Sequence, residues 1–185
     1  MNYPIDISNV VLRTERLILR AWRQEDLDDF YEYAKVDGVG QMAGWKPHES
    51  RAESQEILKM FIDGKRDFAI EYQGKVIGSL GINNYKEKEF KEFEHLKCRE
   101  IGFTLSKDYW GLGIMPEAVR EVIRYLFEDV GLDIICCGHF IWNNQSERVQ
   151  EKCGFKHYKY NQYRTLMGTI EEHEAKILRR EDWDK

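Results

Sequence analysis

The stretch "CREIGFTLSKDYWGLGIMPEAVREVIRYLFEDV", residues 98–130, constrains the fold more than any other part of the chain. It predicts a strand, then a turn that contains Gly111 and Gly113, then a long helix with Pro116 in its first turn. A helix N-terminus exposes unpaired N–H groups and a partial positive charge. The turn is therefore either a plain connection or a nest of backbone N–H groups that holds an anion.

Two common phosphate-binding motifs do not fit this turn. A nucleotide-hydrolase loop ends in Gly-Lys-Ser/Thr, whereas Ile114 and Met115 follow the second glycine here. A dinucleotide fingerprint has a third glycine where this chain has Pro116.

The rest of the chain predicts a mixed order of strands and helices. A strand at 12–22 precedes helices at 23–36 and 49–65, and a hairpin turns at "QGK" within 66–85. Residues 86–97 are highly charged and predict an exposed connector. Another strand at 132–142, a short helix at 143–155 and one or two further strands follow. This order predicts a single α/β domain over residues 1–185.

Composition excludes several classes of protein. The formal net charge of -5 argues against a nucleic-acid partner. The sequence has no apolar run of the roughly 20 residues that span a bilayer, and its start lacks the pattern of a secretory signal. We therefore expect a cytoplasmic protein without a membrane partner.

The cysteines (Cys98, Cys136, Cys137 and Cys153) form no CxxC pair, so we expect reduced, buried thiols and no metal site.

The segment "REIGFTLSKDYWGLGIMPEA", followed by "NNQSERVQEKCGF", resembles the GCN5-related N-acetyltransferases (GNAT). "TERLILR" near the start and "REDW" near the end resemble the branch that acetylates the N-terminal alanine or serine of ribosomal proteins. The resemblance implies a strongly twisted mixed sheet of six to seven strands, splayed after the fourth, with about four helices. It also implies that acetyl-CoA, as co-substrate, lies in the split.

The resemblance assigns the cofactor-binding residues one by one. The backbone of the glycine-rich loop would hold the CoA pyrophosphate, and three strand residues would pair with the pantetheine arm. Asn143 and Ser146 match the branch's Asn-x-x-Ser beside the thioester. The loop residues are Gly111, Leu112, Gly113, Ile114 and Met115, and the strand residues are Phe103, Thr104 and Leu105. The family's usual basic residue before the loop is Asp108 here.

Two side chains are candidates for catalysis. Glu100 occupies the strand position at which several family members carry a catalytic glutamate; the alternative is a carboxylate paired with Arg99 or a lysine. The family's frequent general acid, a tyrosine, is Gln150 here. Ser146 is then the candidate that hydrogen-bonds the leaving thiolate, and its alternative is an N-cap of the short helix.

Other side chains have two open interpretations each. Met42, Trp45 and Tyr85 either line the acceptor pocket or pack elsewhere, and His139 either faces the cleft or is a core histidine. A further set either contacts the adenosine phosphate or is simply solvated: Lys107, Arg148 and Lys152.

The predicted function is acetyl-CoA-dependent transfer to a primary amine, on a protein N-terminus or a small molecule, by direct attack in a ternary complex. A CoA-binding sensor without turnover is the alternative, because Gln150 replaces the acidic tyrosine. A dinucleotide oxidoreductase is disfavoured by Pro116. Because dimers are common among relatives, the resemblance also suggests a homodimer.

Overall fold

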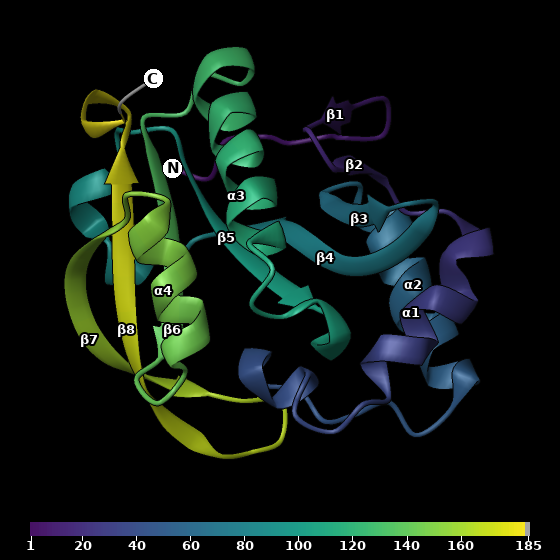
Figure 1. The fold of residues 1–185 in the computed structure, drawn as a ribbon. Helices are drawn as coiled ribbons and strands as arrows, with labels where there is room; N and C mark the ends of the chain where they lie inside the picture. Colours follow the sequence, from purple (N-terminus) through teal and green to yellow (C-terminus); the bar gives the residue numbers. More distant parts are fainter. Residues whose placement is uncertain (184–185) are drawn as a thin grey trace.

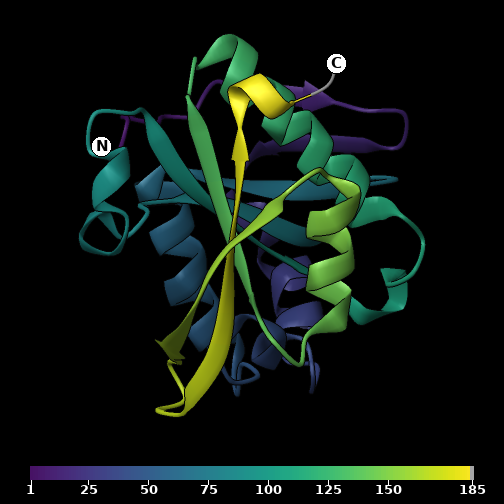
Figure 2. The same cartoon turned by 90° about the vertical axis from the view of Figure 1, so that its left-hand side faces the viewer.

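The computed structural model, which describes residues 1–183, is built on one eight-stranded mixed sheet (Figure 1). Its strand order is β1-β2-β3-β4-β5-β6-β8-β7, and only β5 and β6 pair in parallel. The strands are β1 Val11–Arg13, β2 Leu17–Ala21, β3 Asp67–Tyr72, β4 Lys75–Asn83, β5 Cys98–Leu105, β6 Ile134–Phe140, β7 Lys156–Arg164 and β8 Ile170–Arg179. The twisted β7–β8 hairpin lies in front in Figure 2.

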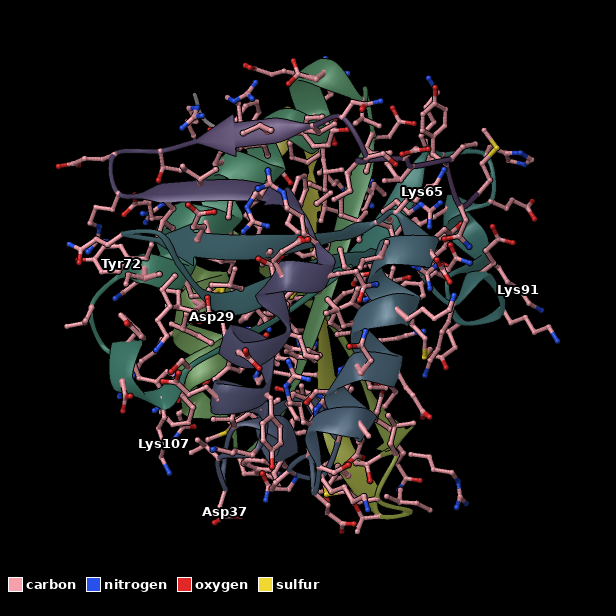
Figure 3. The ribbon with its side chains drawn as sticks, turned by 90° about the vertical axis from the view of Figure 1, so that its right-hand side faces the viewer. Asp29, Asp37, Lys65, Tyr72, Lys91 and Lys107 are labelled. Carbon is pink, nitrogen blue, oxygen red and sulfur yellow. The ribbon has the colours of Figure 1, made fainter. Side chains whose placement is uncertain are left out.

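Four α-helices cover the two faces of the sheet. They are α1 Leu27–Ala34, α2 Arg51–Gly64, α3 Ile114–Arg124 and α4 Asn144–Lys152, and a π-helical turn at Tyr125–Asp129 extends α3. Figure 3 shows α1 and α2 over the face that they share. Alternate residues of β3 enter separate cores: Phe68 packs with the α3 side, whereas Ala69 packs with α1 and α2.

The sheet parts between β5 and β6. Their parallel register runs from Cys98 opposite Ile134 to Ile101 opposite Cys137 and ends there, although both strands continue. Past that point, among residues 1–183, β6 pairs only with β8, and β5 pairs only with β4. The ribbons diverge toward the tip of β5 (Figure 1). The expected splayed sheet is confirmed.

The strand count differs from the expected six to seven because residues 11–21 form a hairpin of two strands. Thr14 makes the turn: its hydroxyl accepts a hydrogen bond from the Leu17 amide at 3.0 Å, and its own amide donates to the Leu17 carbonyl. The split therefore follows the predicted fourth strand, 98–105, which is the fifth in the structure. An apolar pattern interrupted by "TER" cannot distinguish one long strand from a short hairpin.

The charged connector at 86–97 is only partly exposed, which corrects the sequence prediction. Phe90 and Phe93 are buried, stack on each other and pack against Tyr85 and Tyr158. Two 3₁₀ turns, Glu87–Glu89 and Lys91–Phe93, turn these rings inward. The two aromatic residues within the charged run were the available signal.

All four cysteines are free and buried, as the sequence predicted. Cys98 and Cys136 lie in the core beside β8, while Cys137 and Cys153 lie in the core under α3. None of the helices within residues 1–183 is both long and apolar enough to cross a membrane.

A buried ion pair fixes α1 to the sheet. Arg20 of β2 donates from Nη1 and Nη2 to the two carboxylate oxygens of Asp26, at 2.9 and 2.8 Å, and Nε donates to Glu71. Asp26 also accepts a hydrogen bond from the Arg23 amide at 2.8 Å. These contacts set the angle at which the chain leaves β2 toward α1.

We expect Asp26→Ala to lower the free energy of unfolding by about 3–5 kcal/mol, because it leaves the Arg20 guanidinium buried without its main partner. The control is Asp28→Ala, which removes an exposed partner of Arg51 and should cost less than about 1 kcal/mol. Urea denaturation of both variants measures the difference, and equal midpoints would contradict the assignment.

Candidate active site

The turn before α3 presents backbone N–H groups to one side. Gly111 and Gly113 have φ values of 77° and 74°, in the left-handed region that favours glycine. Gly113 is the N-cap of α3, and no side chain in the described part of the chain caps the helix. On the outer side, Arg16 donates from Nη1 to the Leu112 carbonyl at 3.0 Å. The turn thus has the geometry of an anion nest at a helix N-terminus.

A groove of about 380 Å³ opens beside this turn, between the tip of β5, the start of α3 and α4. Of the predicted cofactor residues, all but Leu112 line it: Phe103, Thr104, Leu105, Gly111, Gly113, Ile114, Met115, Asn143 and Ser146. The Leu112 side chain is 56% exposed. The structure therefore brings the predicted set together, and its role in holding CoA stays a prediction.

The start of α4 assigns separate roles to Asn143 and Ser146. Asn143 is the N-cap: its Oδ1 accepts from the Ser146 amide at 3.1 Å, and its Nδ2 donates to the Met42 carbonyl. The alternative interpretation of Ser146 as the N-cap is therefore wrong. The Ser146 hydroxyl instead accepts a hydrogen bond from Gln150 Nε2 at 3.1 Å. With Nε2 as the donor in this contact, the hydroxyl proton of Ser146 can point elsewhere.

A buried polar network stands behind Ser146. Gln150 Nε2 also donates to the Gly138 carbonyl at 3.0 Å, and Gln150 Oε1 lies 3.2 Å from His139 Nδ1. His139 Nε2 lies 3.4 Å from Glu174 Oε2, and Glu174 Oε1 lies 2.7 Å from His157 Nδ1. His139 is only 4% exposed and has partners on both ring nitrogens, as expected for a core histidine, although it also contributes to the lining of the second cavity described below.

His139, Glu147 and Glu174 have ligand atoms close enough together to hold a metal ion. The Lys176 ammonium lies about as close to these carboxylates, 3.9 Å from Glu147 and 4.0 Å from Glu174. Its side chain is buried and supplies the positive charge that the two carboxylates attract.

A second cavity, of about 590 Å³, adjoins the groove and shares Met42, Phe103, Thr104 and Ser146 with it. Its floor is the α1–α2 face of β3, β4 and β5, and aromatic side chains form much of its wall. The two spaces therefore meet at Ser146 and the β5 tip.

Glu100 lies on the floor of this second cavity. Arg99 points away and donates to the Tyr3 carbonyl and to Asn84. Within residues 1–183 the Glu100 carboxylate makes no hydrogen bond or ion pair, so the alternative of a carboxylate ion-paired with Arg99 or a lysine does not hold. Burial raises the pKa of Glu100 to about 7, against a smaller opposing effect of Lys86. A carboxylate with this pKa can take up a proton near neutral pH.

The predicted acceptor-pocket residues separate into two groups. Met42 and Trp45 line the second cavity. Tyr85 does not: it is 2% exposed, and its hydroxyl accepts a hydrogen bond from the N-terminal ammonium of Met1 at 2.7 Å. This corrects the interpretation of Tyr85 as a pocket residue. Its position after a strand gave no signal for a contact 84 residues away.

Only some of the side chains that were candidates for binding the adenosine phosphate lie at the groove. Arg148 and Lys152 line the groove. Lys107 does not line it. Its ammonium donates to the Asp37 carbonyl at 3.2 Å and lies over the Trp110 ring. Lys107 and Asp37 are labelled at the same end of the molecule in Figure 3.

Sequence reasoning missed three residues. Arg16 supports the glycine turn, whereas the sequence "TERLILR" indicates only a family resemblance. Gln150 holds Ser146, although its sequence position indicated only a missing tyrosine. Asp67 begins β3 and lies in the second cavity, and nothing in "KRDFAIEY" marked it. Only tertiary packing reveals these three roles.

The family model described as "Acetyltransferase (GNAT) domain" matches residues 16–156. The FsC-acetyl coenzyme A-N(2)-transacetylase of Aspergillus fumigatus is 37% identical over 45% of this chain, which spans only 37% of that relative's length. The uncharacterized N-acetyltransferase YoaA of Bacillus subtilis is 27% identical over 79% of this chain and 82% of its own.

Solved structures share the fold. A GNAT-family acetyltransferase from Bacillus anthracis superposes with a TM-score of 0.79 at 19% identity, covering 93% of this chain and 99% of its own. The ribosomal-protein-S5-alanine acetyltransferase from Vibrio fischeri gives 0.70 at 20% identity, covering 96% and 100%.

If the glycine turn binds pyrophosphate, Gly113→Val should weaken CoA binding at least tenfold, or ~1.4 kcal/mol. A β-branched residue is strained at this positive φ and displaces the N–H groups. Gly131→Val is the matched control, because Gly131 has a φ of 77° and open space around it, but does not line the groove. Calorimetry with CoA measures both; equal affinities in folded variants would make the turn a plain connection.

Proposed function

The chain belongs to the GNAT acetyltransferase family, and we propose that it moves the acetyl group of acetyl-CoA to a primary amine by direct attack in a ternary complex. The observation that carries the proposal is that the groove beside the glycine turn and the second cavity adjoin each other. The groove holds the predicted CoA residues, and the adjoining cavity holds a partnerless carboxylate, Glu100. A donor and an acceptor bound in these spaces would meet at Ser146.

The groove fits the donor. The N–H groups at the start of α3 are suited to the pyrophosphate, and Arg148 and Lys152 add positive charge beside it. Past Ile101 the edge of β5 that faces β6 has lost its strand partner. An extended arm with amide groups can pair along that edge as a strand would.

Glu100 is assigned the proton from the acceptor. An alkyl ammonium must lose a proton before its nitrogen can form the N–C bond to the acetyl carbonyl. Glu100, with a pKa of about 7, can take that proton at neutral pH. The C–S bond then breaks and the sulfur leaves with the electron pair. The second proton lost from the nitrogen passes to that sulfur, which leaves as the free thiol of CoA.

Ser146 is assigned the role of donating a hydrogen bond to the leaving sulfur. Gln150 Nε2 donates to the serine oxygen, so the hydroxyl proton can point into the groove. A hydrogen bond to the developing thiolate would stabilise negative charge where it forms. Gln150 therefore has a structural role in this mechanism, which removes the main reason to prefer a sensor without turnover.

The acceptor class includes a protein N-terminus, as the name of the Vibrio fischeri neighbour indicates for that protein, and small amines. A protein N-terminus and a small amine each present a primary amine, and either nitrogen could react where the groove meets the second cavity.

Glu100→Gln should lower kcat roughly 10²-fold with CoA affinity unchanged, because it removes the base and keeps the size of the side chain. In the wild-type protein the rate should rise with pH through about 7, as Glu100 loses its proton. The variant should lack this inflection and recover part of its rate at higher pH, where more of the acceptor is already neutral. A pH–rate series with one acceptor measures both, and superimposable profiles would reject Glu100 as the base.

Ser146→Ala should lower kcat more than it raises KM for acetyl-CoA. Because Asn143 is the helix cap, the melting temperature should change little. Asn143→Ala is the contrasting variant and should destabilise the protein by about 0.5–2 kcal/mol through the lost cap. A normal kcat in Ser146→Ala would exclude the serine from thiolate stabilisation.

A further inference from the structure

Asp67 is a second partnerless carboxylate in the acceptor cavity. It begins β3 and lines the cavity, and its carboxylate makes no hydrogen bond or ion pair with any residue from 1 to 183. Other carboxylates of low exposure in this protein do have partners: Asp26 pairs with Arg20, and Glu174 pairs with His157. An unpaired carboxylate in a low-exposure site is costly, so its presence in a ligand cavity indicates a cationic group on the ligand.

The sheet register places Asp67 and Glu100 on one face. Asp67 is opposite Gly81 of β4, and Gly81 is opposite Gly102 of β5. Residues directly opposite share a face, and so do residues two apart in a strand. Glu100, two residues before Gly102, therefore projects to the same side as Asp67.

The two glycines between these carboxylates leave room for the side chains of Asp67 and Asn83 on the floor of the cavity. A Cβ on Gly81 would lie 2.5 Å from Asp67 Oδ1 and 3.5 Å from Asn83 Nδ2, so the carboxylate lies over the glycine with the amide beside it. A Cβ on Gly102 would meet only Asn83 Nδ2, at 3.5 Å. From the usual strand spacing and rise, the Cα atoms of Asp67 and Glu100 are roughly 12 Å apart. A short, extended ligand fits across this floor.

The walls suit the carbon chain and the charge of such a ligand. Trp45, Phe61 and Tyr163 line the cavity above the floor. Aromatic faces attract cations and pack against methylene groups. Arg66 precedes Asp67 and does not line the cavity, although its charge opposes the effect of burial on the pKa of Asp67. Lys46 does line the cavity, and its ammonium pairs with Glu49.

We propose that the acceptor is a small primary amine with a second cationic nitrogen, which Asp67 binds while the reacting nitrogen lies near Glu100 and Ser146. This proposal rests on the proposed function, since it identifies the substrate class of the same site. Asp67 acts in specificity: it holds the far end of the acceptor and takes no part in proton transfer.

The test compares 1,4-diaminobutane with butylamine, which has the same carbon chain and one nitrogen. In the wild-type protein kcat/KM should be at least tenfold higher for the diamine. Asp67→Asn should raise KM for the diamine about tenfold or more and change KM for butylamine much less. Asp63→Asn is the control; it removes an exposed carboxylate of the nearby α2 and should change neither.

Three results would overturn the proposal: equal kcat/KM for both amines, an equal effect of Asp67→Asn on both, or faster acetylation of a short peptide N-terminus with no effect of Asp67→Asn. Butylamine turnover without a diamine preference contradicts this inference alone, whereas CoA binding with no turnover of any amine contradicts the proposed function. Calorimetry of 1,4-diaminobutane with CoA-saturated protein needs no turnover. Loss of that binding in Asp67→Asn, and its retention in Asp63→Asn, would support the role of Asp67.

Discussion

The early end of the β5–β6 pairing is the constraint on which the site depends. Four residue pairs hold the two strands together, from Cys98 and Ile134 to Ile101 and Cys137. Beyond them, a free strand edge faces β6, which keeps its only partner on the other side. An interior strand edge without a partner is unfavourable unless something else pairs with it. The fold is therefore suited to an extended ligand that lies in the split.

The site is assembled from elements that the split separates. β5 supplies Glu100 and the free edge, whereas β6 is followed by Asn143 and α4, which carries Ser146. The Asn143 side chain bonds the Met42 carbonyl and so ties the loop before α2 to the start of α4. Both residues line the groove, so this contact helps to fix its shape. It also explains why the groove and the acceptor cavity share Met42.

The sequence predicted the local parts better than their connections. Hydrophobic periodicity and the glycine turn identified α3, β5 and most of the groove, because these signals lie within short stretches. The hairpin at 11–21, the buried Phe90 and Phe93 and the contact of Tyr85 with the N-terminus were missed, because each is decided by residues far away in the chain. Asp67 was missed for the same reason: its meaning comes from Gly81, Gly102 and Glu100, which only sheet pairing brings alongside it.

The unpaired carboxylates of Asp67 and Glu100 affect the stability of the folded protein. Burial raises the pKa of Asp67 to about 6 and that of Glu100 to about 7. A raised pKa in the folded state means that these groups favour folding when protonated, and that this contribution is lost as the pH rises through about 6 and 7. At neutral pH both sites therefore reduce the stability of the free protein. A cationic acceptor would supply the opposite charge, so the groups that destabilise the free protein are those that would favour the bound amine.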